Sequence, residues 1–316
     1  MPQDLLARRP LGRIAIDVPA IAVGCAPLAG MPDTFGYDVP EDTALATIRA
    51  ALEGPLNWLD TAAAYGDGES ERRIGRVLRD LGGLPAGAFL DTKVGASPDG
   101  DYSADTVRRR FHRSLELLGL DRLELVFLHD PERSTFDEVT APGGPLEALH
   151  QLRDEGLIGH LGVAGGPIDM EIRYVETGLF DAVITHNRYT LLNRSADPLL
   201  TLAAARGLAV LNAAPYGSGM LAKGPSRYPR YAYGEASGAM VERARRLEAI
   251  CARYRVPLAA AALQFSLRDP RITATIVGMS RPERLAQTLE LARVAIPKAC
   301  WEELATVPVD TRDPVA

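Results

Sequence analysis

The sequence of 316 residues lacks the features that mark several common classes of protein. Its three cysteines, Cys25, Cys251 and Cys300, have no CxxC spacing, so we expect reduced, buried thiols rather than a disulfide framework or a cysteine-bound metal. No basic run is present, and the net charge of -6 argues against nucleic acid as a partner. No apolar stretch is long enough to cross a membrane, and the first residues lack a signal-peptide core. We therefore expect a cytoplasmic protein without a metal centre.

What the sequence does contain is a regular alternation of short apolar segments and amphipathic helical segments. Such alternation predicts parallel strands joined by crossover helices. Eight units in this length predict a closed (β/α)8 barrel, the TIM-barrel fold, with residues 1–316 as a single domain. We also expect an N-terminal hairpin near 13–18 and extra helices towards the C-terminus. The predicted strands are 20–26, 58–61, 89–94, 123–129, 158–164, 182–185, 208–213 and 274–277.

Four polar side chains fall at or just after the ends of three consecutive predicted strands: Asp60, Tyr65, Lys93 and His129. Strand ends converge at the C-terminal mouth of a barrel, so we expect one pocket. There, the ammonium of Lys93 is expected to lower the pKa of Tyr65, and Asp60 to hold Lys93. A neutral His129 would orient a substrate oxygen. Each residue alone also fits a structural role, such as a solvated lysine or a core histidine, but the combination favours proton transfer coupled to hydride transfer.

With these residues in place, the chain resembles the aldo-keto reductase superfamily. The resemblance implies a barrel that binds a nicotinamide cofactor in an extended pose without a Rossmann domain. It implies that Tyr65 is the general acid/base, Lys93 tunes it, Asp60 partners the lysine and His129 orients the substrate. The segments that carry the resemblance are WLDTAAAYGDGESERRIGRVL (58–78), LDTKVG (90–95), LVFLHDPE (125–132), YGSGMLAKG (216–224) and the tail 256–290.

A narrower resemblance points to the aldose 1-dehydrogenase group, which includes dehydrogenases of L-fucose, D-threo-aldose and L-galactose and a pyridoxal 4-dehydrogenase. It implies oxidation of the hemiacetal carbon of a small sugar to a lactone, or of pyridoxal as an alternative. An NADPH-dependent aldehyde or ketone reductase, a Schiff-base lyase using Lys93 and a non-catalytic cofactor-sensing subunit remain open. We expect a monomer or small homo-oligomer. The segments concerned are NRYTLLNRSADPLL (187–200), NAAPYGSGMLAKG (212–224), YAYGEA (231–236) and VPLAAAALQFSLRDP (256–270).

The resemblance also implies a set of cofactor-binding positions, some of which depart from the common pattern. Many relatives have Ser-Asn where this chain has Ala164-Gly165, a glutamine in place of His186, and a stacking aromatic in place of Ala213. The pyrophosphate is expected along the backbone of 216–221, where glycines permit close approach or simply form a tight turn. The implied positions are Gly24, Cys25, Asp60, Ala164, Gly165, His186, Tyr216, Gly217, Ser218, Gly219, Leu221, Gly278, Met279, Ser280, Arg284, Gln287 and Thr288.

Two further expectations concern cofactor choice and substrate contacts. Gly278 stands where an NADP-type pattern carries a lysine, while Arg284 is retained, so we expect NAD rather than NADP, with either admissible. The segment 215–238 is too long for a passive connection and is predicted to be a binding loop or lid. Tyr228, Tyr231 and Tyr233 are expected to contact substrate together with Tyr65 and His129; alternatively, the three loop tyrosines pack the loop onto the barrel.

Overall fold

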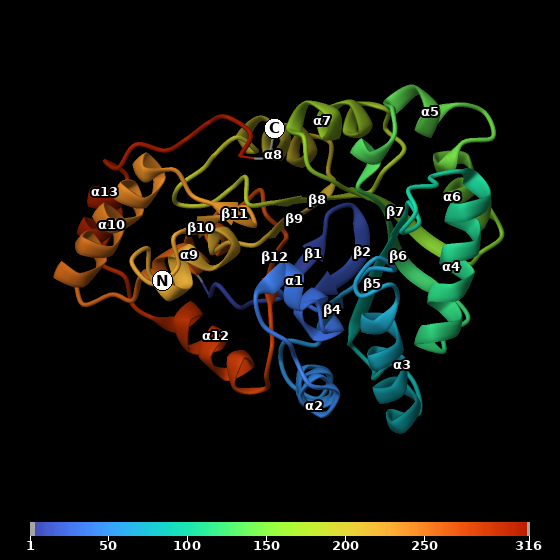
Figure 1. Ribbon diagram of the computed structural model, residues 1–316, viewed down its shortest axis with the longest axis horizontal. Coiled ribbons are helices and arrows are strands. Elements are labelled where there is room, and N and C mark those ends of the chain that lie inside the picture. The colour runs from blue at the N-terminus through green and yellow to red at the C-terminus, as the bar shows by residue number, and fades with distance from the viewer. Residues whose placement is uncertain (1–3, 315–316) are drawn as a thin grey trace.

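A computed structural model describes residues 4–314 of the chain. Eight parallel strands close into a barrel in the order β12-β3-β4-β5-β6-β7-β8-β9, with helices around it (Figure 1). The predicted (β/α)8 barrel is therefore confirmed, with every predicted strand in its place. The strands are β3 (Ile21–Gly24), β4 (Trp58–Asp60), β5 (Phe89–Gly95), β6 (Leu123–His129), β7 (Ile158–Ala164), β8 (Ala182–His186), β9 (Ala209–Ala213) and β12 (Ala274–Gly278).

The helices that connect the strands pack around the barrel through their apolar residues. In α3, Gly75 permits close packing on α4, since a Cβ atom there would lie 1.9 Å from the carbonyl oxygen of Leu117. The start of α4 is fixed by Ser103, whose hydroxyl accepts the amide of Thr106. The barrel helices are α2 (Glu41–Leu52), α3 (Glu69–Leu81), α4 (Ala104–Leu118), α6 (Pro145–Asp154), α7 (Ile168–Glu176), α8 (Asp197–Ala205), α11 (Leu258–Leu267) and α12 (Glu283–Arg293).

The barrel interior has an apolar lower part and a polar top. Alternate residues of each strand point inwards, so Phe89, Asp91 and Lys93 of β5 form successive layers. The lower layers contain Trp58, Phe89 and Phe127 in one buried cluster. The N-terminal hairpin, β1 (Arg9–Leu11) and β2 (Ile14–Val18), closes this end and adds its own apolar residues to the cluster. The opposite, C-terminal mouth is therefore the end of the barrel where polar side chains can gather.

Additional elements lie outside the eight units. The helices α10 (Gly238–Arg253) and α13 (Lys298–Leu304) pack together and cover a second apolar cluster. The expected binding loop is largely structured, with η3 (Gly217–Gly219), α9 (Met220–Lys223) and a hairpin of β10 (Arg230–Tyr231) and β11 (Gly234–Glu235). Other short elements are η1 (Ala26–Ala29), α1 (Pro32–Phe35), η2 (Pro131–Arg133) and α5 (Phe136–Thr140).

The cysteines and the helices agree with two expectations from composition. The three cysteines are buried and free, as expected. None of the helices within residues 4–314 is long and apolar enough to cross a membrane.

Candidate active site

The structure brings Asp60, Tyr65 and Lys93 into direct contact at the C-terminal mouth of the barrel. Lys93 Nζ lies 2.7 Å from Asp60 Oδ2 and donates a hydrogen bond of 3.0 Å to the hydroxyl of Tyr65. It also donates to the carbonyl oxygen of Thr61 at 2.8 Å. Asp60 and Lys93 are each 3% exposed, so the ion pair is shielded from water. This arrangement fixes the ammonium between a carboxylate and a phenol.

The chain segment after β4 delivers Tyr65 to this position. It continues along β5, because the amides of Thr61 and Ala63 donate to the carbonyl oxygens of Asp91 and Lys93. The chain then turns at residues 66–68, all of which have positive φ. The side chain at the centre of this turn, Asp67, pairs with two arginines of α4, Arg110 and Arg113. The turn is thereby attached to the helix layer, and Tyr65 is held over the mouth.

Burial controls the acid–base behaviour of this cluster. It raises the pKa of Tyr65 well above the ordinary value, and the opposing effect of Lys93 is smaller. Lys93 therefore lowers the pKa of Tyr65 as expected, but burial, which the sequence did not predict, raises it by more, and the neutral phenol is the resting form. Burial lowers the pKa of Lys93, but the acidic groups around it, Asp60 foremost, together outweigh burial and raise the pKa overall. A lysine held protonated is a poor nucleophile, which argues against the Schiff-base lyase alternative.

His129, the last residue of β6, stands beside the phenol. Its ring is edge-on to the ring of Tyr65, with centroids 5.9 Å apart. The hydroxyl of Tyr102 donates to the carbonyl oxygen of His129 at 2.7 Å and fixes the end of the strand. Burial lowers the pKa of His129, so its imidazole is neutral at neutral pH, as expected from the sequence. A neutral ring can donate to or accept from a substrate oxygen.

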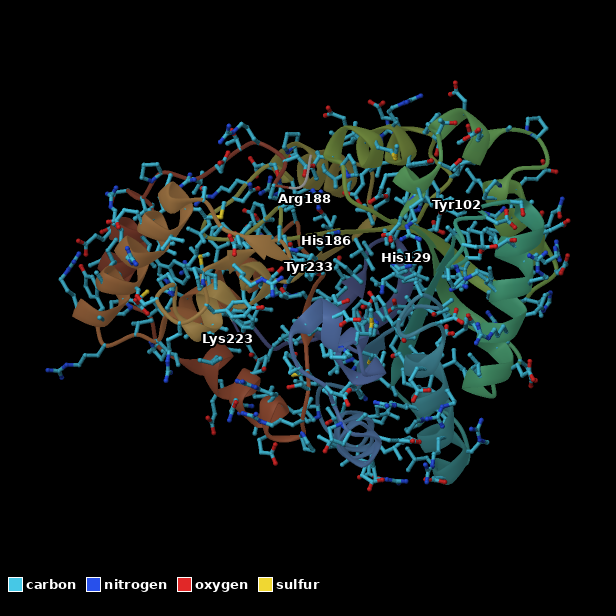
Figure 2. The ribbon with its side chains drawn as sticks, viewed as in Figure 1. Tyr102, His129, His186, Arg188, Lys223 and Tyr233 are labelled. Carbon is cyan, nitrogen blue, oxygen red and sulfur yellow. The ribbon has the colours of Figure 1, made fainter. Side chains whose placement is uncertain are left out.

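The three loop tyrosines have different environments. Tyr233 is 44% exposed, and its ring lies 6.1 Å from that of His186 near the middle of the barrel mouth (Figure 2). Tyr231 is buried, and its hydroxyl donates to the carbonyl oxygen of Asn187 at 2.6 Å. The expected substrate contact of Tyr231 is therefore wrong, because this residue packs the loop onto the barrel. Tyr228 lies against the ammonium of Lys223, and its ring lies close to Gly219, one of the predicted cofactor positions.

The predicted pyrophosphate-binding segment, 216–221, lies at the same mouth. Fewer of its backbone amides than expected are free to bind an anion. The amides of Gly217, Gly219 and Leu221 already donate to backbone carbonyl oxygens within residues 214–216. Gly217 has φ of 57°, and a Cβ atom there would lie 2.3 Å from the ring of Tyr231, so only glycine fits. Ser218 uses its hydroxyl to join Asn187 to the β10–β11 hairpin. An anion bound to this turn would therefore contact the amides that are not already bonded to backbone carbonyl oxygens.

Several other predicted cofactor positions are buried. The buried side chains are those of Cys25, Ala164, Leu221, Met279 and Thr288. Contact of these positions with a cofactor stays a prediction. Gly24 and Gly278 are paired in register on adjacent strands, β3 and β12, at the mouth. The amide of Gly165 is already bonded to the buried carboxylate of Glu171 at 3.1 Å.

A cationic cluster near the end of β12 includes Lys223, which was not among the cofactor positions predicted from the sequence. Lys223 Nζ lies 3.9 Å from the ring centroid of Tyr228 and 5.8 Å from that of Tyr37. Burial lowers the pKa of Lys223, and the nearby charges of Arg284 and Arg230 lower it further. Across residues 4–314, neither Lys223 nor Arg284 has a carboxylate partner. Two unpaired cations and the buried, unpartnered hydroxyl of Tyr216 suit the phosphates of a dinucleotide.

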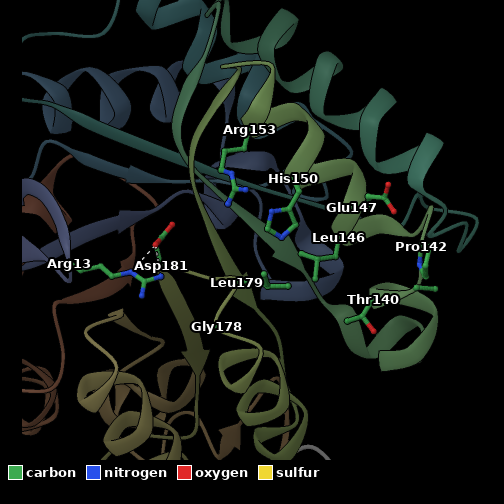
Figure 3. A pocket seen from close by; sticks show the side chains of 11 residues that line it. Arg13, Thr140, Pro142, Leu146, Glu147, His150, Arg153, Gly178, Leu179 and Asp181 are labelled. Atoms are coloured by element: carbon green, nitrogen blue, oxygen red, sulfur yellow. Dashed lines mark hydrogen bonds and ion pairs between the residues drawn. The ribbon is translucent and has the colours of Figure 1, made fainter.

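The cavity shown in Figure 3 lies elsewhere and is not this site. It has a volume of about 490 Å³ and lies beside α6 and the turn before β8. Its lining includes His150 and Arg153 of α6 with Leu179 and the Arg13–Asp181 ion pair. None of the four side chains at the barrel mouth borders it. The convergence of Asp60, Tyr65, Lys93 and His129, rather than cavity size, identifies the candidate active site.

Comparison with known proteins agrees with this geometry. The Aldo/keto reductase family pattern matches residues 21–307. D-threo-aldose 1-dehydrogenase of Pseudomonas sp is 33% identical over 91% of this chain and 93% of its own length. Pyridoxal 4-dehydrogenase of Microbacterium luteolum is 30% identical over 94% and 96% of the two chains. The holo form of an aldo-keto reductase from Bacillus halodurans has the same fold, with a TM-score of 0.76, 22% identity and coverage of 96% and 98%.

Proposed function

Because this chain belongs to the aldo/keto reductase family of oxidoreductases, we propose that it oxidises the hemiacetal carbon of a small aldose to a lactone. The observation that carries the proposal is the buried Asp60–Lys93–Tyr65 cluster at the barrel mouth. Similarity to a D-threo-aldose 1-dehydrogenase supports an aldose as substrate, and the proposal covers aldoses of the L-fucose, D-threo-aldose or L-galactose type. Similarity to a pyridoxal 4-dehydrogenase keeps pyridoxal, which forms an internal hemiacetal, as the alternative substrate.

The side chains divide the proton chemistry between them. A hemiacetal hydroxyl hydrogen-bonded to both Tyr65 and His129 would be oriented with its carbon towards the cofactor positions. Tyr65 receives the hydroxyl proton, and the fixed charge of Lys93 stabilises the phenolate that this transfer requires. When bound, a nicotinamide cofactor supplies the hydride acceptor. Since burial raises the pKa of Tyr65, the phenolate fraction and hence the oxidation rate should increase with pH.

The cofactor is a nicotinamide dinucleotide, for which we propose NAD as the preferred form. Gly278 provides no charge at the position where a lysine is expected to meet a 2′-phosphate. Lys223 and Arg284 nevertheless bring unpaired positive charge to the same region, so NADP should also be accepted. The preference between NAD and NADP then depends on two opposing features: Gly278 provides no positive charge for a 2′-phosphate, whereas Lys223 brings one to the same region.

A second candidate function is the NADPH-dependent reduction of small aldehydes or ketones. The specific observation in its favour is that the resting form of Tyr65 is the phenol, which is the acid needed to protonate a developing alkoxide. The cationic pair of Lys223 and Arg284 also suits a phosphorylated cofactor. The intact four-residue site argues against a purely cofactor-sensing subunit.

A substrate screen distinguishes these functions. The purified protein is incubated with L-fucose, D-arabinose, L-galactose or pyridoxal and either NAD or NADP, while reduced cofactor is followed by absorbance and product by mass spectrometry and NMR. Formation of a lactone from any of these hemiacetals supports the proposal. Efficient NADPH-driven reduction of simple aldehydes, with no lactone from any hemiacetal, would reject it in favour of the reductase.

A further inference from the structure

A second buried carboxyl group lies directly beneath the Asp60–Lys93 ion pair. Asp91 is two residues before Lys93 on β5 and pairs in register with Asp60 of β4. The strand alternation places Asp91 and Lys93 on the same inward face. Asp91 is 0% exposed, and its Oδ1 accepts the indole N–H of Trp58 at 2.5 Å. The active-site lysine therefore faces two carboxyl groups.

The charges of this group of side chains do not balance if both carboxyls are ionised. Two carboxylates and one ammonium would leave a net negative charge in a space that excludes water, which is strongly unfavourable. Two carboxyl groups in contact normally share one proton. Asp60 Oδ2 lies 2.7 Å from Lys93 Nζ, so Asp60 is the one that retains its charge. Asp91 Oδ2 is buried and has no donor within hydrogen-bond reach, which is the environment of a protonated oxygen.

We propose that Asp91 is a positioning residue that holds a proton and donates it to Asp60, orienting the carboxylate that keeps Lys93 against Tyr65. Burial and the charge of Asp60 raise the pKa of Asp91 well above its usual range, while Lys93 opposes them. The thiol of Cys25 is a further titratable neighbour; its pKa is raised by burial, and it carries no charge at neutral pH. The kinetic part of the inference rests on the proposed function of Tyr65, whereas the proton on Asp91 does not.

Infrared spectroscopy of the whole protein tests the proton without substrate or cofactor. With the aspartate carboxyl carbons isotopically labelled, the wild type should show a protonated-carboxyl band that shifts on labelling at neutral pH and disappears in Asp91→Asn. Glu71 is the matched control, because it is a buried acid bonded to Thr92 on the outer side of the same strand, and Glu71→Gln should retain the band. Absence of the labelled band in the wild type, or its persistence in Asp91→Asn, would overturn the proposal.

Kinetics then test the positioning role. Asp91→Ala removes the hydrogen bond to a charged partner and should lower kcat at least ~10-fold, while Asp91→Asn, whose amide can still donate to Asp60, should recover most of that loss. Both a protonated carboxyl and an amide are neutral, so the pH at which oxidation rises should be the same in Asp91→Asn and the wild type. A shift of that rise to lower pH in Asp91→Asn would mean that Asp91 is ionised, and the proposal would fail.

The two tests also separate this inference from the proposed function. If the infrared band behaves as expected but Tyr65→Phe retains full activity, the role of Tyr65 is rejected while the proton on Asp91 stands. If Asp91→Ala does not fold, Asp91→Asn still provides both the spectrum and the pH profile. Equal losses of kcat in Asp91→Ala and Asp91→Asn would overturn the positioning role.

Discussion

At the scale of single residues, the proposed chemistry depends on opposing effects at one phenol. Burial makes Tyr65 a weaker acid, and the ammonium 3.0 Å away makes its ionised form easier to reach. Asp60 supplies the negative charge that keeps Lys93 protonated. The phenol is thus neutral at rest but adjacent to a fixed positive charge, which allows proton transfer in either direction.

The Tyr65→Phe variant should remove the proton acceptor. We expect kcat to fall at least ~100-fold, the lower range for loss of a general acid/base. Cofactor binding, measured by quenching of protein fluorescence, should persist, and the rise of the residual rate with pH should disappear. Near wild-type turnover in this variant would contradict the proposed mechanism.

The Lys223→Met variant should reveal which cofactor the cationic cluster serves. We expect the wild type to prefer NAD in kcat/KM, and the variant to lose NADP-dependent activity by ~10-fold, the equivalent of one charged contact, with a smaller effect on NAD. Steady-state kinetics with both cofactors and one good substrate provide the measurement. A clear NADP preference in the wild type would show that Lys223 and Arg284 suffice without a lysine at position 278.

His186 should make the fold sensitive to acid. Burial lowers its pKa from 6.5 to about 4, so the native state binds fewer protons than the unfolded state between these values. The contribution of His186 to stability is therefore present above 6.5 and is lost as the pH falls to about 4. Urea unfolding across this range should show a smaller loss in His186→Gln, whereas the exposed His112→Gln control should keep the wild-type slope. Equal slopes in all three proteins would contradict this account.

At the scale of elements, the β10–β11 hairpin carries two tyrosines with different roles: Tyr231 is buried, and Tyr233 is exposed. Tyr231 fastens the hairpin through the carbonyl oxygen of Asn187, and the positive φ angles of Ala232 and Tyr233 turn the next ring outwards. The amide of Tyr233 is held by the hydroxyl of Ser218 at 3.1 Å. The loop is thus a rigid support that presents one aromatic ring to the mouth.

A pair of variants tests this division. Tyr231→Phe removes two hydrogen bonds, to the carbonyl oxygen of Asn187 and to the hydroxyl of Thr190, and should lower the free energy of unfolding by about 2 kcal/mol and therefore lower Tm. Tyr233→Ala should leave Tm nearly unchanged but raise KM for the substrate, because it removes an apolar face at the mouth. Calorimetry and steady-state kinetics on both variants provide the comparison. A loss of stability in Tyr233→Ala but not in Tyr231→Phe would contradict the structural role of Tyr231 and the substrate contact of Tyr233.

At the scale of the whole molecule, the sequence predicts the barrel well because each strand is an apolar run followed by a helical pattern. The catalytic candidates were predictable for the same reason, since Asp60 and His129 end strands and Lys93 lies near the end of one. The inward alternation of β5 also contained the signal for Asp91, two residues before Lys93.

Other features depend on contacts between distant segments and leave no local pattern. The burial of Tyr231 follows from a glycine at position 217 and an acceptor at Asn187. The approach of Lys223 to Arg284 joins the loop after β9 to the helix after β12. The pKa of Tyr65 reflects how far the folded chain excludes water, a quantity that spacing along the sequence does not give.

The most direct test of the account is the fate of the hydrogen on the hemiacetal carbon. An aldose oxidised in the screen is prepared with deuterium at its anomeric carbon and incubated with the enzyme and the preferred oxidised cofactor. We predict one deuterium in the reduced cofactor for each lactone formed. Tyr65→Phe should form both products only at its low residual rate. Deuterium that remains on the sugar, or lactone that forms without labelling the cofactor, would contradict hydride transfer from the hemiacetal carbon.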